Sequence, residues 1–152
     1  MIPAFDENGR LPVGIHVCTL KEFEDRFLNN QTRKVLYAGL KRLISDLRKL
    51  ECEDLYIDGS FVTSEILPKD IDVCWGDERI DDPRYLQSLF EKLPHFFLYP
   101  SLHKKKYSCD VFPSYGYNVE KKLFYLDYFQ RVKQTNVSKG IIKLKFNSHD
   151  KK

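Results

Sequence analysis

The stretch over residues 56–75, YIDGSFVTSEILPKDIDVCW, constrains the fold of this chain more than any other. It begins as a short apolar strand, breaks at Gly59-Ser60, and re-enters a strand that carries Asp70 and Asp72. Alternate side chains of a strand point to the same face, so these two carboxylates are predicted to lie side by side. Two anions held that close repel each other unless a cation lies between them, and oxygen ligands suit magnesium.

Simpler explanations exist for each carboxylate. Asp70 follows Pro68-Lys69 and could be a turn residue, whereas Asp72 could pair with a lysine. The alternation also places Ile71 on the opposite face, where it would anchor the strand to the core. An Asp-x-Asp sequence alone is therefore a weak signal for a metal site.

The preceding Gly59-Ser60 pair makes the signal more specific. A strand that ends in Gly-Ser and turns into a short helix presents backbone N–H groups and a hydroxyl without bulk, which favours a bound phosphate. The alternative is a glycine that only permits a tight turn. Together with the paired carboxylates, the turn predicts a magnesium–nucleoside triphosphate site in which Gly59 and Ser60 contact the nucleotide.

Composition limits the classes of protein to which the chain can belong. Its 152 residues, 42% apolar and 31% charged, predict one folded domain over residues 1–152. The net charge of +3 neither demands nor excludes nucleic acid. No apolar run approaches the roughly 20 residues of a membrane helix, and the amino terminus has no apolar signal region. The four scattered cysteines read as reduced thiols, so we expect a cytoplasmic protein without a membrane partner.

The pattern of apolar residues predicts an α/β (α+β) fold, with a small mixed β-sheet flanked by helices. Residues 1–18 are expected to form an extended arm or a hairpin, and residues 147–152 a frayed tail. Helices are expected over residues 20–28, 32–50 and 82–97. Strands are expected over residues 54–58, 70–75, the latter half of 103–112, and 140–146. Residues 121–132 fit a helix or a strand.

The predicted helix over residues 32–50 has one basic face, opposite its leucine stripe. Such a face could contact nucleic acid, but it is more typical of a solvated surface. The cations are Lys34, Lys41, Arg42, Arg48 and Lys49.

The sequence GSFVTSEILPKDID resembles the signature of nucleotidyltransferases of the DNA polymerase beta type, in which Gly-Ser precedes Asp-x-Asp by a short loop. The resemblance covers roughly residues 31–113. The small size is similar to that of the minimal nucleotidyltransferases of bacteria and archaea, often found beside toxin-like partner proteins. The arm IPAFDENGRLPVGIH also resembles that of a little-characterised bacterial group of short nucleotidyltransferase-like proteins. The resemblance implies a nucleotidyltransferase-like fold.

The family pattern requires a third carboxylate on a later strand, and Asp110 in KKKYSCDVF matches it. The resemblance implies that Asp70, Asp72 and Asp110 are catalytic and bind two magnesium ions. It also implies that ATP or another nucleoside triphosphate is the substrate, and that Asp110 orients or deprotonates the acceptor hydroxyl. In-line attack on the α-phosphate would then release pyrophosphate.

Two lysines are further candidates for nucleotide contacts. If the strand were regular from residue 104, Lys104, Lys106 and Asp110 would share a face, and Lys106 could reach triphosphate oxygens. The alternative is a solvated strand entrance. Many minimal nucleotidyltransferases carry Ala-Arg-Gly shortly after Gly-Ser, whereas this chain has FVTS at residues 61–64. Lys69 is one candidate to replace that arginine.

Three functions are consistent with these patterns. The first is transfer of a nucleoside monophosphate, AMP from ATP, onto a hydroxyl of a partner protein, a tRNA end or a small molecule. The second is an antitoxin-like binding protein that keeps the fold but has weak catalysis. The third is a nuclease or phosphatase with the same acidic cluster. Asp58, directly before the turn, is either a helix cap or a group behind the metal ligands. The sequence does not determine the oligomeric state.

Overall fold

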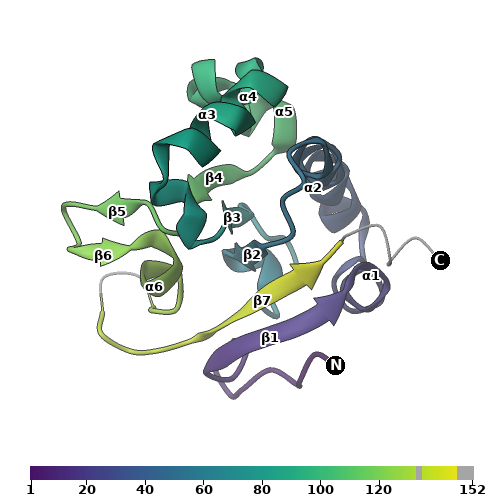
Figure 1. Cartoon of the computed structure of the whole chain (residues 1–152). Helices are drawn as coiled ribbons and strands as arrows, with labels where there is room; N and C mark the ends of the chain where they lie inside the picture. The colour runs from purple at the N-terminus through teal and green to yellow at the C-terminus, as the bar shows by residue number, and fades with distance from the viewer. Residues whose placement is uncertain (133–134, 147–152) are drawn as a thin grey trace.

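A five-stranded mixed sheet forms the centre of the fold in a computed structural model that describes residues 1–132 and 135–146 (Figure 1). In spatial order its strands are β1 (Gly14–Thr19), β7 (Gly140–Lys145), β2 (Leu55–Asp58), β3 (Asp72–Trp75) and β4 (Asp110–Pro113). The pairs β1–β7 and β3–β4 are parallel, whereas β2 is antiparallel to both of its neighbours. The last of these strands in sequence therefore lies inside the sheet.

Helices flank the sheet, so the chain is a mixed α/β (α+β) protein, as the sequence predicts. The helices are α1 (Leu20–Phe27), α2 (Gln31–Lys49), α3 (Pro83–Lys92), α4 (Pro94–Leu98), α5 (His103–Tyr107) and α6 (Tyr125–Phe129). Single 3₁₀ turns occur at η1 (Ser60–Val62), η2 (Glu78–Asp81) and η3 (Pro100–Leu102). A two-stranded hairpin, β5 (Tyr117–Asn118) and β6 (Leu123–Phe124), precedes α6.

Both faces of the sheet are covered by apolar side chains. Ile57 and Val73 pack into the larger core, which includes residues of α1 and α2. Tyr56 and Cys74 pack into a smaller cluster with Leu126 of α6. Because side chains alternate along a strand, the even-numbered residues of β2 and β3 face α6. This parity decides which polar side chains meet at the ends of these strands.

The first two helices and the last strand confirm the sequence predictions for residues 20–28, 32–50 and 140–146. The capping box before α1 is complete. The backbone N–H of Glu22 donates to the Thr19 hydroxyl at 3.1 Å, and that of Thr19 donates to the Glu22 carboxylate at 3.0 Å. The capping box can be read from the sequence because its two residues lie within one helical turn.

The amino-terminal arm is more than an extended segment laid across the body. Its second half is β1, which pairs in parallel with β7 along its whole length. Ile15 and Val17 are partly exposed at the sheet edge, whereas Cys18 is buried. The larger apolar residues of β1 therefore lie on its exposed face, so the alternation of apolar and polar residues does not predict this strand. Its partner, β7, comes from the other end of the chain.

The helix predicted over residues 82–97 is two helices. Leu93 lies between them with φ −146° and ψ 71°, outside the helical region. The residue before a proline is disfavoured in helical geometry, and Pro94 then starts α4 where its missing N–H costs nothing. The break lets Phe96 turn into the core, edge to face with Trp75 at 5.4 Å.

The strand predicted over the latter half of residues 103–112 is β4, which begins at Asp110. Residues 103–107 form α5, and Ser108 ends it in the left-handed region at φ 56°. α5 packs closely on α2, because a Cβ atom on Gly39 would lie 2.2 Å from the carbonyl oxygen of Tyr107. The face predicted to be shared by Lys104, Lys106 and Asp110 is therefore wrong, since the two lysines are helical.

Three other predictions concern residues 121–132, the strand from residue 70, and the tail at residues 147–152. Residues 121–132 contain both of the alternatives, because β6 leads directly into α6. The strand predicted from residue 70 begins as β3 at Asp72, which leaves Asp70 in the preceding loop. The predicted frayed tail, residues 147–152, lies outside the described residues.

Candidate functional site

Three aspartates meet at one end of the sheet. Asp72 is the first residue of β3, Asp110 is the first of β4, and the two are register partners in neighbouring parallel strands. Asp70 lies in the loop before β3, and all three line one cavity of about 440 Å³. Ile71 and Val73 are fully buried on the opposite face and anchor this segment, as the alternation predicts.

The carboxyl group of Asp72 has a strongly raised pKa. Burial is the main cause that raises its pKa to about 7, and the negative charges of Asp70, Asp58 and Asp110 add to the rise. Asp58 ends β2 directly opposite Asp72 in register. Burial also raises the pKa of Asp58, although Lys139 opposes that rise. A bound cation would relieve this crowding of anions.

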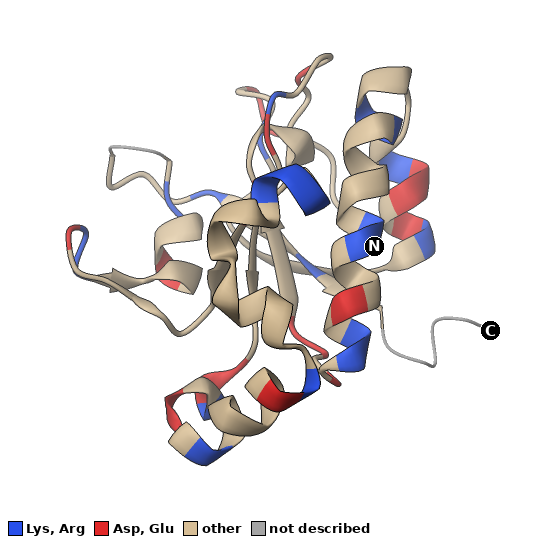
Figure 2. Ribbon diagram, turned by 90° about the horizontal axis from the view of Figure 1, so that it is seen from above, with Lys and Arg blue, Asp and Glu red and all other residues tan. Residues whose placement is uncertain are grey.

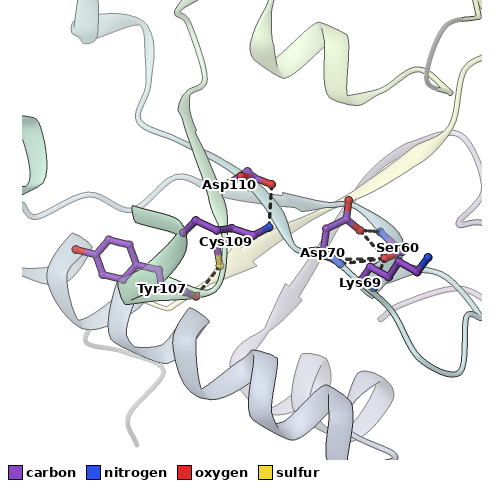
Figure 3. Close-up of polar contacts among 7 residues, drawn as sticks. Ser60, Lys69, Asp70, Tyr107, Cys109 and Asp110 are labelled. Carbon is purple, nitrogen blue, oxygen red and sulfur yellow. Dashed lines mark hydrogen bonds and ion pairs between the residues drawn. The ribbon is translucent and has the colours of Figure 1, made fainter. Parts of the chain in front are cut away.

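The turn at Gly59-Ser60 holds Asp70 in place (Figure 3). The backbone N–H of Ser60 donates to Asp70 Oδ1 at 2.9 Å, and the Ser60 hydroxyl donates to the same oxygen at 2.5 Å. The next two N–H groups, of Phe61 and Val62, donate to the carbonyl oxygens of Asp70 and Gly59. These donors are already used within the protein, so phosphate binding by Gly59 and Ser60 stays a prediction.

Gly59 is required by the geometry of the turn itself. Its φ is +90°, and a Cβ atom there would lie 3.0 Å from the backbone nitrogen of Asp72 and 3.1 Å from the carbonyl oxygen of Asp70. Both the backbone conformation and the close approach of the next strand favour glycine. The tight turn therefore explains this glycine by itself, and a contact between Gly59 and a nucleotide stays a prediction.

Arg33 of α2 fixes the loop at residues 61–66, which begins with FVTS. Its side chain is 3% exposed. The guanidinium donates to the carbonyl oxygens of Phe61 at 2.6 Å, Thr63 at 2.9 Å and Glu65 at 2.6 Å. The planar fork of arginine suits several acceptors at once. Sequence reasoning missed this role because Arg33 belongs to a helix that precedes the loop by a full strand.

The two lysines predicted to contact nucleotide do not line the cavity formed by the described residues. Lys106 pairs with Asp46 of α2 at 3.0 Å, a consequence of the helical conformation of α5. Lys69 has an exposed side chain, and its backbone N–H donates to the Ser60 hydroxyl at 3.0 Å. Lys69 therefore contributes a backbone hydrogen bond to the turn.

Two other lysines neutralise carboxylates at the cavity. Lys104 of α5 pairs with Asp110 at 3.0 Å, and Lys139, just before β7, pairs with Asp58 at 2.8 Å. Asp58 is therefore an ion-pair partner rather than a helix cap, because the N-cap of η1 is Gly59. Lys139 was not identified from the sequence, since it lies far from every motif in the chain.

Over residues 1–132 and 135–146, no three His, Cys, Asp or Glu side chains are already arranged as a metal-binding group. Asp70 accepts from Ser60, and Asp110 accepts from Lys104. The three aspartates therefore share a cavity while two of them are engaged by neighbouring donors.

The cavity has a basic and aromatic wall that sequence analysis did not identify. Arg10 of the amino-terminal arm and Arg131 after α6 line it, as do the rings of Phe112 and Tyr128. These residues come from three separate segments, so no short motif contains them. The Asn8-Gly9 pair beside Arg10 is a turn signal in the sequence, and it predicts a bend rather than a binding site.

The basic face of α2 has local partners of its own. Arg48 donates to the carbonyl oxygen of Phe146 at 2.8 Å, and Lys49 pairs with Asp46 at 3.3 Å. Figure 2 shows Lys and Arg interspersed with Asp and Glu along the helices seen from above. This arrangement matches the solvated surface that the sequence favours.

Two further observations concern the chain as a whole. The four cysteines are free and buried. None of the helices in the described part of the chain combines the length and the apolar character needed to cross a membrane.

Comparison with known proteins places the chain in a family. A search of curated proteins and a search of solved structures each found no match. Residues 3–145 match the family described as "Family of unknown function (DUF6932)", and this range includes the arm, the whole sheet and every residue of the cavity. The chain therefore belongs to the family DUF6932.

Proposed function

We propose that this protein is a nucleotidyltransferase that moves a nucleoside monophosphate, AMP from ATP, onto a hydroxyl of a protein or RNA. The observation that carries the proposal is the meeting of Asp70, Asp72 and Asp110 in one cavity, with two of them in register on neighbouring strands. The order of elements also supports a nucleotidyltransferase fold. A strand, a Gly-Ser turn, an acidic strand and a later acidic strand follow one another and lie side by side.

The donors in the cavity fit magnesium. They are carboxylate oxygens, which hard divalent cations prefer, and burial together with their mutual repulsion raises the pKa of Asp72 to about 7. Asp70, Asp72 and Asp110 would hold the metal. When bound, two magnesium ions would supply charge neutralisation for the triphosphate and a more acidic acceptor hydroxyl.

The chain's own residues supply position and proton transfer. Ser60 orients the Asp70 carboxylate through two hydrogen bonds to one oxygen. Asp110, at the start of an outer strand, accepts the proton of the acceptor hydroxyl or orients it. The rings of Phe112 and Tyr128 give the cavity an apolar side suited to a base. Most of the rate enhancement would come from positioning and electrostatics.

A second candidate function is an antitoxin-like binding protein with weak catalysis. The ion pair between Lys104 and Asp110, at 3.0 Å, favours it, because a lysine already neutralises one of the three carboxylates. The tight hold of Ser60 on Asp70 points the same way. In this reading a toxin-like partner protein would bind the fold without any transfer reaction.

Replacing Lys104 by methionine tests whether this ammonium competes with a metal ion. We expect Lys104→Met to bind Mn²⁺ or Mg²⁺ about two- to fivefold more tightly, because a partly exposed ion pair contributes up to about 1 kcal/mol. Titration calorimetry would measure the affinity. Lys92→Met is a matched control, since Lys92 forms an exposed pair with Glu51 at 3.4 Å. Unchanged or weaker binding in Lys104→Met would contradict the expectation.

The transfer reaction itself is tested with α-labelled ATP, GTP, CTP and UTP incubated with the protein and cell extract. We expect label from ATP to appear in a protein or RNA, with release of pyrophosphate, and to disappear in the Asp70→Asn/Asp72→Asn double variant. If the label stays in nucleotides and a partner binds without nucleotide, the result would support the antitoxin-like binding protein as the function. Cleavage of nucleic acid without added triphosphate would support a nuclease.

A further inference from the structure

The backbone of the amino-terminal arm holds Arg10 at the rim of the cavity. Asp6 closes a tight turn, because its side chain accepts from the N–H groups of Asn8 and Arg10 at 2.8 and 3.1 Å. On either side of Arg10, the arm is bonded to the body. The carbonyl oxygen of Gly9 accepts from the N–H of Ser64 at 2.9 Å, and that of Leu11 accepts from the N–H of Gly140 at 3.1 Å.

These two anchors belong to the walls of the cavity. Gly140 starts β7 and lines the cavity itself, as does Thr63, the neighbour of Ser64. Leu11, next to Arg10, is 2% exposed and packs in the core. The arm is therefore fixed between the loop after the Gly-Ser turn and the start of a central strand. Arg10 is thus presented to the cavity by a backbone that is already ordered.

Arg131 is fixed in a comparable way on the α6 side. Its N–H donates to the carbonyl oxygen of Tyr128 at 3.2 Å, and it forms an isolated antiparallel bridge with Ser138. Its guanidinium donates to Asn136 Oδ1 at 3.4 Å. Among the described residues, neither Arg10 nor Arg131 forms an ion pair with a carboxylate. Lys104 and Lys139, by contrast, are both paired.

The backbone N–H groups of the Gly-Ser turn are already used in hydrogen bonds, so Arg10 and Arg131 are the candidates to donate hydrogen bonds to an anion. The N–H groups of Ser60, Phe61 and Val62 all donate within the protein. A phosphate chain in this cavity therefore needs donors from elsewhere. A guanidinium offers a planar fork that matches phosphate oxygens in pairs, and it keeps its charge at any working pH.

We propose that Arg10 and Arg131 bind the phosphate chain of the nucleotide, so that the amino-terminal arm is part of the nucleotide site. The identity of the ligand rests on the proposed function, whereas the polyphosphate site stands on the geometry of the cavity. The cavity, at about 440 Å³, has the size of small-molecule sites. Carboxylates in the same cavity would face a metal ion that the phosphate chain carries with it.

Titration calorimetry with inorganic tripolyphosphate and Mg²⁺ tests this site without any nucleotide. We expect the full chain to bind tripolyphosphate, and Arg10→Gln and Arg131→Gln each to bind about tenfold or more weakly, because hydrogen bonds to charged groups are strong. Arg10→Lys should fall between, since it keeps the charge and loses the fork. Arg84→Gln, which removes an exposed arginine of α3, should bind as the parent chain does.

The outcomes separate this site from the transfer reaction. Weakened tripolyphosphate binding in both glutamine variants, with unchanged thermal unfolding, supports the site even if labelled ATP is never transferred. Equal binding by Arg10→Gln, Arg131→Gln and the parent chain overturns it, even if transfer is observed. Failure of the parent chain to bind tripolyphosphate in the presence of Mg²⁺ also overturns it.

Discussion

Asp72→Asn is expected to remove Mg²⁺-dependent binding of ATP and to lower nucleotidyl transfer by about a thousandfold or more. Asp72 lies between Asp58 and Asp110 in the register of three neighbouring strands, so its carboxylate is central to the acidic cluster. An amide of the same shape keeps the packing but loses the charge. Calorimetry with Mg²⁺ and ATP, together with release of labelled pyrophosphate, would measure both effects.

In the absence of metal, the same substitution is expected to stabilise the folded chain. Burial raises the folded-state pKa of Asp72 to about 7, above its ordinary value of 3.8, so the folded chain binds more protons than the unfolded chain between these values. The stability that this group contributes is complete below about pH 4 and is lost as the pH rises to about 7. In EDTA, Asp72→Asn should therefore unfold a few degrees higher than the parent chain at pH 7, and the difference should vanish near pH 4. A lower unfolding temperature at pH 7 would contradict the crowding of carboxylates.

Arg33→Met is expected to cost about 3 kcal/mol of unfolding free energy, equivalent to a fall of about 6–12 °C in Tm for a domain of this size. Methionine has a similar length but no donors, so three backbone carbonyl oxygens of the loop after the Gly-Ser turn lose their partner. Thermal unfolding followed by circular dichroism would measure the change.

Arg84→Met provides the matched control for this prediction. Arg84 is exposed on α3, and the same change there should alter Tm by no more than about 2 °C, as for surface substitutions in general. A second expectation follows from the position of the loop. Arg33→Met should also make the segment at residues 61–66 a preferred site of limited proteolysis. Equal Tm values for the two variants would show that Arg33 is not what holds the loop.

The sequence predicted the parts of the fold that depend on local patterns. The capping box at Thr19 and the leucine stripe of α2 need no tertiary partner, so their positions follow from spacing alone. The alternation of Asp70, Ile71 and Asp72 likewise placed two carboxylates on one face and an apolar anchor on the other. These signals were sufficient for the fold class and for the carboxylate cluster.

The sequence did not predict features that depend on contacts between distant segments. α5 occupies positions at which a regular strand from residue 104 would have placed Lys104 and Lys106, and it packs where Gly39 of α2 lets the chain at Tyr107 approach closely. Arg10 and Arg131 reach the cavity from opposite ends of the chain, so neither belongs to a motif. The hold of Arg33 on the loop is also long-range, as it joins α2 to residues beyond β2.

The place of β7 in the sheet has a consequence for biosynthesis. This strand lies between β1 and β2, yet it is the last of the three to leave the ribosome. Until residue 145 emerges, β1 has no strand to pair with and β2 keeps one open edge. The nascent chain therefore cannot complete its sheet by vectorial folding from the amino terminus, and long-range closure of this kind is slow. A nascent chain of this topology is a natural client for chaperones that shield unpaired strands.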